Sequence, residues 1–177
     1  MLPFVHRIIQ NAYYVSDLDS AIDRWHRLLG IGPFFVRRHI VLPEVRYRGQ
    51  AAQLDISAAY VQAGTIQLEL VTQHNDAPSA FRDLYGPGES GFHHVAVLPD
   101  DYDAWIARYV ALGYPVATEL VTASGRGAAY MDTRALLGHM VEVYRPSDGL
   151  QALYRDVAAA AAQWDGRELR IEVDPMR

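Results

Sequence analysis

A short pattern occurs twice in this chain, and its polar residues fall at matching places in both copies. The first copy starts at Asp17 and reads Asp-Leu-Asp-Ser-Ala-Ile-Asp-Arg-Trp; the second starts at Asp101 and reads Asp-Tyr-Asp-Ala-Trp-Ile-Ala-Arg-Tyr. Seven residues before these aspartates stand Gln10 and His94. An internal repeat of this kind predicts two similar structural units. Two such units can build one shared site on their pseudo-twofold axis.

Each copy is flanked by strand and helix signals in the same order. In the first, a strand is predicted over 4–15, then a helix capped by Ser16 or Asp17 and ended by Gly30, then strands near 33–40, 53–62 and 65–72. In the second, a strand near 92–98 and a helix over 100–112 precede strands near 115–121, 127–132 and 139–145. The sequence therefore predicts two βαβββ modules, at 1–72 and 92–146, in an α+β fold.

The remaining segments connect or extend these modules. Residues 73–91 are rich in turn formers and are predicted to be the linker, with room for a short helix over 79–85. Ser147 can cap a C-terminal helix, and residues 147–177 comprise this helix and a polar tail that is either a loose end or a docking strand. We expect all of these segments to form one structural domain.

Composition excludes several classes of function. A net charge of −5 offers no basic surface to a nucleic acid, and the absence of cysteine excludes disulfides, thiolate ligands and thiol nucleophiles. No apolar run approaches the roughly 20 residues of a membrane span, and the first residues do not resemble a secretory signal. We therefore expect a cytoplasmic protein without a nucleic acid or membrane partner.

Each module places one carboxylate within an apolar strand, Glu69 in Ile-Gln-Leu-Glu-Leu-Val and Glu142 in Met-Val-Glu-Val-Tyr. A buried carboxylate needs a hydrogen-bonding partner, a counter-charge or a metal. If the strands of each module curl around a cleft, the residues on their matching faces converge there: Gln10, Glu69, His94 and Glu142. The alternative is that each side chain lies on a wet or packed face, and that the repeat records a duplication without a surviving site.

The ordered motifs resemble the vicinal oxygen chelate superfamily, whose members pair two βαβββ modules in a curled mixed sheet around a metal cleft. The resemblance rests on four segments: Val15–Ala21 with Leu28-Leu29-Gly30, Gln67–Leu70, Gly91–Val97 and Met140–Val143. Gly-Phe-His-His is most similar to methylmalonyl-CoA epimerases, in which the second histidine, here His94, is a ligand. The Gln, Glu, His, Glu set is similar instead to glyoxalase I, although Tyr14 stands where those enzymes place an arginine for glutathione.

The resemblance implies a divalent cation (Zn, Co, Ni, Mn or Mg) held by Gln10, Glu69, His94 and Glu142. It implies a small-molecule substrate such as an acyl-CoA, and a base that is Glu142 or Glu69 in glyoxalase-like members. Asp55 is the nearest match to the additional carboxylate of the epimerases. These features predict an isomerase, epimerase or lyase that removes a proton beside a carbonyl and acts as a homodimer.

Two other functions occur in the same superfamily. A metal-free drug-binding protein of the bleomycin-resistance type would lack the ligand set, and an extradiol-type ring-cleaving dioxygenase would present two histidines and one glutamate to iron. Other polar residues are expected to be structural. His93 faces away from His94, and a basic stretch is expected on a solvated face: Arg37, Arg38, Arg46 and Arg48.

Overall fold

The computed structural model describes residues 7–174, and the first three residues of the strand predicted over 4–15 lie outside this range. The first half contains β1 (Ile8–Tyr14), α1 (Leu18–Leu29), β2 (Phe34–Arg37), β5 (Ile56–Ala63) and β6 (Ile66–Gln73). The second contains β7 (Gly91–Val97), α2 (Tyr102–Ala111), β8 (Val116–Val121), β9 (Gly127–Met131) and β10 (Met140–Tyr144). The predicted βαβββ order is present twice, which confirms the expected α+β fold class.

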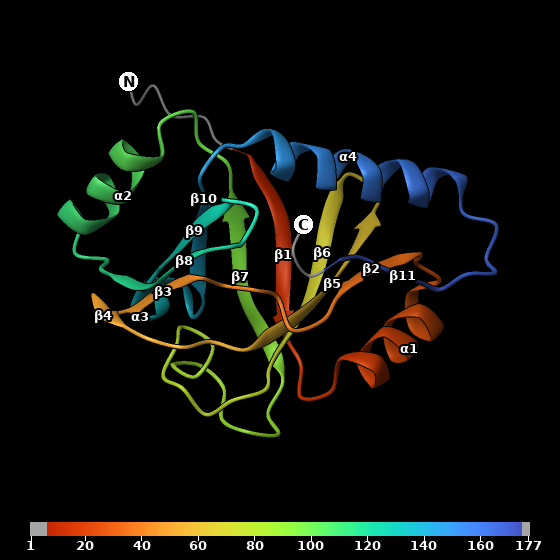
Figure 1. Ribbon diagram of the computed structural model, residues 1–177, viewed down its shortest axis with the longest axis horizontal. Helices are drawn as coiled ribbons and strands as arrows, with labels where there is room; N and C mark the ends of the chain where they lie inside the picture. The colour runs from red at the N-terminus through yellow and green to blue at the C-terminus, as the bar shows by residue number, and fades with distance from the viewer. Residues whose placement is uncertain (1–6, 175–177) are drawn as a thin grey trace.

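All strands join one curled mixed sheet with the order β11-β2-β5-β6-β1-β7-β10-β9-β8-β3-β4. Within each half the first strand pairs in parallel with the last, β1 with β6 and β7 with β10. The two halves meet where β1 and β7 pair in an antiparallel manner, at the centre of the sheet (Figure 1). The pseudo-twofold axis therefore passes between the strands that carry Gln10 and His94.

Local signals explain the ends of the helices. Asp17 accepts a hydrogen bond from the Ser20 amide at 2.7 Å and so caps α1, and Gly30 ends this helix in the left-handed conformation. Asp101 caps α2 in the equivalent way. Ser147 caps α4 (Asp148–Gln163), as predicted.

Three hydrophobic clusters show how the helices cover the sheet. Leu18 and Ile22 of α1 pack with Val36 and Val61 on the outer face of the first half. Tyr102 of α2 packs with other apolar residues on the outer face of the second half. The inner face is covered by α4, which runs over it in Figure 1, and by the connecting segment that contains Phe81. The cleft predicted between the halves is therefore roofed by the C-terminal helix.

Several elements were not predicted. A hairpin of β3 (Glu44–Tyr47) and β4 (Gln50–Ala51) crosses to the other half, where β3 pairs with β8. A short helix, α3 (Arg134–Leu137), precedes β10. The tail supplies β11 (Arg170–Glu172), which pairs with β2 and confirms the docking strand, one of the two alternatives predicted for the tail. Residues 80–84 form turns, where a short helix was expected over 79–85. Ser79 Oγ accepts the amides of residues 81 and 82 as an N-cap does, and the amides of Asp83 and Tyr85 make two helical backbone bonds, but Gly86-Pro87 ends the segment at once.

Candidate metal centre

The central strands bring ligand-type side chains together because an alanine stands opposite each of them. Ala12 of β1 lies between Glu69 of β6 and His94 of β7. Two residues away, Ala96 of β7 lies between Gln10 of β1 and Glu142 of β10. The small alanine side chains leave room above the sheet for their larger neighbours to converge. Ala12 and Ala96 occupy equivalent positions of the repeat, so the arrangement follows the pseudo-twofold symmetry.

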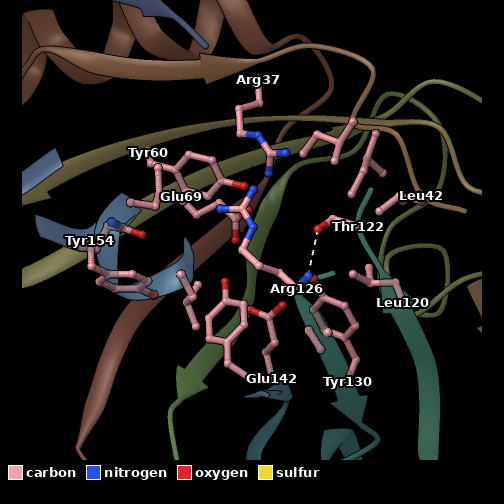
Figure 2. A pocket seen from close by; sticks show the side chains of 18 residues that line it. Arg37, Leu42, Tyr60, Glu69, Leu120, Thr122, Arg126, Tyr130, Glu142 and Tyr154 are labelled. Carbon is pink, nitrogen blue, oxygen red and sulfur yellow. Dashed lines mark hydrogen bonds between the residues drawn. The ribbon is translucent and has the colours of Figure 1, made fainter. Parts of the chain in front are cut away.

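Three of the four predicted ligands form a tight buried cluster. His94 Nε2 lies 3.1 Å from Glu142 Oε2 and 3.4 Å from Glu69 Oε2, and all three side chains are almost inaccessible to solvent. Within residues 7–174, none of these three atoms has a hydrogen bond of good geometry. Buried polar atoms of native proteins are nearly always paired, so three that face one another without hydrogen bonds fit a cation-binding site. Figure 2 shows both glutamates facing the cavity.

His93 orients the ring of His94. Its Nε2 lies 3.0 Å from the Ala80 carbonyl oxygen, which can only accept, so Nε2 carries the proton and Nδ1 is an acceptor. His93 Nδ1 lies 2.8 Å from His94 Nδ1, which must therefore donate. The lone pair of a neutral His94 then stands on Nε2, toward the two glutamates. The expectation that His93 faces away from His94 is wrong, because the pairing of β1 with β7 shifts register between His94 and Phe92 and the two imidazole rings lie in contact. His93 is fully buried and fixes the His94 tautomer.

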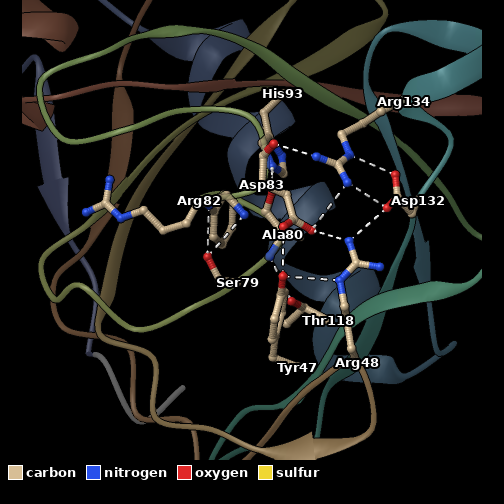
Figure 3. Close-up of polar contacts among 11 residues, drawn as sticks. Tyr47, Arg48, Ser79, Ala80, Arg82, Asp83, His93, Thr118, Asp132 and Arg134 are labelled. Atoms are coloured by element: carbon tan, nitrogen blue, oxygen red, sulfur yellow. Dashed lines mark hydrogen bonds and ion pairs between the residues drawn. The ribbon is translucent and has the colours of Figure 1, made fainter.

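The connecting segment that holds His93 is itself anchored by polar contacts (Figure 3). The Ala80 amide donates to Thr118 Oγ1 at 2.8 Å. Asp83 accepts from Tyr47 and Arg48 at 2.8 and 2.7 Å, and Arg48 also pairs with Asp132. The crossing hairpin therefore supports the segment from which Ala80 reaches His93.

Charge and burial act against one another in the cluster. Burial lowers the pKa of His94, but the nearby charges of Glu142 and Glu69 outweigh it and raise the pKa to about 9. Burial raises the pKa of Glu69, and the pKa of His93 is lowered well below its usual value, first by burial and then by the charge of His94. Without a cation, the cluster therefore holds a proton on His94 while His93 stays neutral.

Gln10 lies in the same buried layer but is engaged by other partners. Its Nε2 donates to Gln67 Oε1 at 2.7 Å, and its Oε1 accepts from Tyr144 at 3.1 Å. The amide thus lies in the same row as Glu142, because both residues stand beside Ala96. Gln10 can supply a fourth ligand if this oxygen turns toward the cluster, because an amide oxygen has two lone pairs and the bond from Tyr144 uses one of them.

The structure does not bring Asp55 to this site. Asp55 immediately precedes β5, whereas the residue of β5 that stands opposite Glu69 is Tyr60. Five residues along a strand correspond to roughly 16 Å. Asp55 instead lies 2.8 Å from His39 Nδ1 in a more exposed cluster with His74.

Tyrosines and arginines complete the lining of the cavity. Tyr60 stands opposite Glu69, and Tyr130 occupies the equivalent position opposite Glu142. Burial raises the pKa of both phenols, so they remain protonated and can donate hydrogen bonds to the carboxylates. Arg37 and Arg126 also line the cavity, as do Leu150, Leu153 and Tyr154 of α4. The expectation of a solvated Arg37 is wrong, because this side chain is only 3% exposed.

The alternation of side chains along β2 predicts that Arg37 faces inward, but the grouping of this residue with neighbouring arginines led to the opposite expectation. Phe35 and Arg37 share one face of β2, and Phe35 pairs with Tyr60. The same alternation turns Arg38 outward, where it pairs with Asp19 and Glu172. For Arg126, which precedes β9 in a loop, no comparable signal exists.

Comparison with known proteins agrees with this architecture. Residues 9–130 match the Glyoxalase/Bleomycin resistance protein/Dioxygenase superfamily. This stretch exceeds half of the chain, so the chain belongs to that superfamily. Among curated proteins, none matches the chain significantly.

Several solved structures share the fold. A methylmalonyl-CoA epimerase from Mycobacterium tuberculosis has a TM-score of 0.50 and 19% identity, over 81% of this chain and 90% of that one. A variant of the Streptomyces coelicolor methylmalonyl-CoA epimerase, in complex with 2-nitronate-propionyl-CoA, has a TM-score of 0.52 and 17% identity, over 82% and 97%. The hypothetical protein BH1468 from Bacillus halodurans C-125 has a TM-score of 0.56 and 15% identity, also over 82% and 97%. At these identities the likeness concerns the fold alone.

Along the described part of the chain, no helix combines the length and apolar character needed to cross a membrane.

Proposed function

We propose that this protein is a metal-dependent isomerase, epimerase or lyase that removes a proton beside a carbonyl group of a small molecule. The observation that carries the proposal is the convergence of His94 Nε2 on Glu69 and Glu142 at 3.4 and 3.1 Å, with none of the three facing atoms otherwise hydrogen-bonded within residues 7–174. Two carboxylates and an imidazole with a fixed tautomer are a donor set that suits Zn, Co, Ni, Mn or Mg.

Glu69, His94 and Glu142 would hold the cation, with Gln10 as a fourth ligand if its amide oxygen turns toward the cluster. When bound, a divalent cation supplies Lewis-acid polarisation of a substrate carbonyl. His93 keeps the His94 proton on Nδ1, away from the cation side of the ring. Tyr60 and Tyr130 stay protonated beside the glutamates and exclude water from them.

The two glutamates are the candidate bases. A base must lie within hydrogen-bond reach of the proton that it removes, and both carboxylates line the cavity in which a substrate would lie. Glu69 and Glu142 come from different halves of the repeat, on strands separated by β1 and β7. An epimerase must remove a proton from one side of a carbon and return it to the other, and a pair of carboxylates from opposite halves suits this requirement. The fold shared with methylmalonyl-CoA epimerases supports the same reaction class.

The proposal is tested by metal titration and by isotope exchange. We expect the purified protein to bind one Mn²⁺ tightly in calorimetry and to incorporate deuterium beside a carbonyl when incubated in D₂O with methylmalonyl-CoA and short 2-oxo acids. Glu142→Gln should abolish both, and the exposed Glu44→Gln should change neither. The proposal fails if wild-type protein binds no divalent cation. Oxygen uptake with a catechol and Fe²⁺ would instead assign the ring-cleaving dioxygenase class.

The homodimer and the cytoplasmic location stay predictions. Size-exclusion chromatography with light scattering tests the first, and fractionation of cells that express the protein tests the second.

A further inference from the structure

A buried amide in the wall of the cavity carries a donor without a partner. Gln67 of β6 is 1% exposed and lines the cavity that Glu69 and Glu142 also line. Its Oε1 accepts a hydrogen bond from Gln10 Nε2 at 2.7 Å, but its own Nε2 is inaccessible to solvent and has no hydrogen-bond partner within residues 7–174. A buried donor that stays unpaired is unfavourable, so this amide calls for a bound molecule in the cavity.

A chain of hydrogen bonds fixes which end of the Gln67 amide carries the free group. Burial raises the pKa of Tyr144 well above its usual value, so this phenol keeps its proton and donates it to Gln10 Oε1 at 3.1 Å. The Gln10 amide then has its NH₂ group on the side of Gln67, where it needs an acceptor. Gln67 supplies that acceptor with Oε1, and its own NH₂ group is left at the end of the chain.

Tyr154 supplies a second donor to the same cavity. It belongs to α4, and its buried Oη makes no hydrogen bond of good geometry in the described part of the chain. Burial raises the pKa of Tyr154 well above its usual value, so the phenol stays protonated. Figure 2 shows Tyr154 lining the cavity into which Glu69 and Glu142 point. The helix above the cavity and the sheet below it therefore each offer one neutral donor.

The free amide lies close to the metal cluster along the sheet. Gln67 and Glu69 follow one another on the same face of β6, so their Cα atoms are about 7 Å apart. Gln67 also stands opposite Gln10, in the row of residues that continues through Ala96 to Glu142. A short ligand with one oxygen at the cluster would therefore bring a neighbouring oxygen toward Gln67.

The size and polarity of the cavity limit the ligand. The cavity volume is about 50 Å³, which corresponds to about four water molecules. Arg37 and Arg126 also line the cavity, but each already has an interaction partner, so they do not call for an anion. An amide N–H and a phenol O–H are neutral donors, which suit an uncharged oxygen. Large aliphatic side chains form much of the remaining wall: Ile40, Leu42, Ile56, Leu120, Leu150 and Leu153.

We propose that Gln67 and Tyr154 bind an uncharged oxygen of the substrate, and that the substrate is a short ketone with a hydroxyl group on the carbon beside its carbonyl. The carbonyl would face Glu69, His94 and Glu142, and the hydroxyl oxygen would accept hydrogen bonds from Gln67 Nε2 and Tyr154 Oη. The position of the carbonyl rests on the proposed metal-dependent function, whereas the subsite formed by the two donors does not.

The test compares 3-hydroxy-2-butanone with 2-butanone, which share a carbon skeleton and differ by a single oxygen. Both ketones are titrated into the full chain with and without Mn²⁺, and their affinities are measured by ligand-observed NMR. We expect the hydroxyketone to bind at least about tenfold more tightly in both states, because only this ketone offers an oxygen to the two donors. The cation should strengthen the binding of both ketones and leave this preference in place.

Three variants assign the preference to the two donors. Gln67→Met, which keeps the length of the side chain but removes the donor, should reduce the preference to about threefold or less, and Tyr154→Phe should reduce it by a smaller factor. Gln62→Met is the matched control, because Gln62 stands opposite Gln67 on β5 but donates to the Gly64 carbonyl at the surface. This variant should leave the preference unchanged.

Equal affinity for the two ketones in the wild-type protein would overturn the proposal, because water alone would then pair with Gln67 Nε2. This comparison needs no variant to fold. A preference that appears only with Mn²⁺ and survives Gln67→Met would place the hydroxyl group on the cation and would also overturn it. Failure of the wild-type protein to bind Mn²⁺ would sink the metal-dependent function, while a preference for the hydroxyketone without the cation would leave the subsite of Gln67 and Tyr154 standing.

Discussion

Two clusters in this molecule combine histidine with carboxylate, and they differ in how their polar atoms are satisfied. In the surface cluster, His39 pairs with Asp55 at 2.8 Å, and His74 Nε2 lies 2.7 Å from Ser57 Oγ. In the buried cluster, the facing atoms of Glu69, His94 and Glu142 lack such hydrogen bonds throughout residues 7–174. Residue type alone therefore does not identify a metal site.

The difference extends to the residues behind each cluster. His94 is oriented through His93 and Ala80 by a chain of contacts that starts in another segment of the protein. His39 is 65% and Asp55 41% exposed, so water competes for their polar atoms. In the buried cluster, the side chains are shielded from water, their facing atoms lack hydrogen bonds, and a neighbouring residue fixes the imidazole; such a site suits a bound cation. In the surface cluster, the side chains are hydrated and paired with one another, so they need no ligand.

The largest effect is expected from Glu142→Gln, which removes one charge from the buried cluster. Removing one member of a buried set of charged groups costs several kcal/mol of interaction free energy, so the affinity for Mn²⁺ should fall at least about hundredfold. His74→Gln, in the surface cluster, should leave the tight Mn²⁺ site unchanged. Calorimetric titration of both variants with Mn²⁺ compares the two clusters. A larger loss of affinity in His74→Gln than in Glu142→Gln would contradict the assignment of the metal site to the buried cluster.

A smaller effect is expected from His93→Phe, which keeps a buried ring but removes the acceptor for His94 Nδ1. Loss of such an orienting partner should lower the Mn²⁺ affinity by roughly ten- to a hundredfold. Nitrogen NMR of the His94 ring above pH 9, where the ring is neutral, should show a changed tautomer population, which a purely structural role would not produce. Unchanged affinity and tautomer would remove His93 from the site.

The affinity for Mn²⁺ should also depend on pH. The pKa of His94 is raised to about 9, above its ordinary value of 6.5, so the cation-free protein carries this proton at pH 7. A cation must displace it, so the affinity should rise by about tenfold per pH unit and level off above pH 9. Calorimetry in buffers of different ionisation enthalpy measures the released proton. A pH-independent affinity would contradict the proton assigned to His94 in the cation-free protein.

The smallest effect is expected from Asp55→Asn. The pair of Asp55 and His39 is exposed, and such pairs contribute about 0.5 kcal/mol to the free energy of unfolding. Urea unfolding should therefore show a small loss of stability, with Mn²⁺ affinity and deuterium exchange unchanged. Loss of exchange in this variant would restore Asp55 as a catalytic candidate.

The repeat was sufficient to predict the fold and the convergence of Glu69, His94 and Glu142, because period-two alternation and equivalent positions can both be read from the sequence itself. The placement of Asp55 could not be predicted in this way, since it depends on where β5 begins relative to β6. The burial of Arg126 and the orientation of His94 depend on contacts with distant segments, such as the one that contains Ala80. The residues of the proposed metal site were visible in the pattern, whereas the residues that orient them were not.

The hairpin of β3 and β4 makes the two halves of the repeat depend on each other structurally. Because Glu44–Tyr47 of β3 pairs with Val121–Thr118 of β8, a hairpin from the first half forms the sheet edge of the second half. A fragment cut between residues 73 and 91 would leave the first half with a dangling hairpin and the second with an uncovered strand. Each half therefore depends on the other to complete its part of the sheet, and neither should fold when expressed alone.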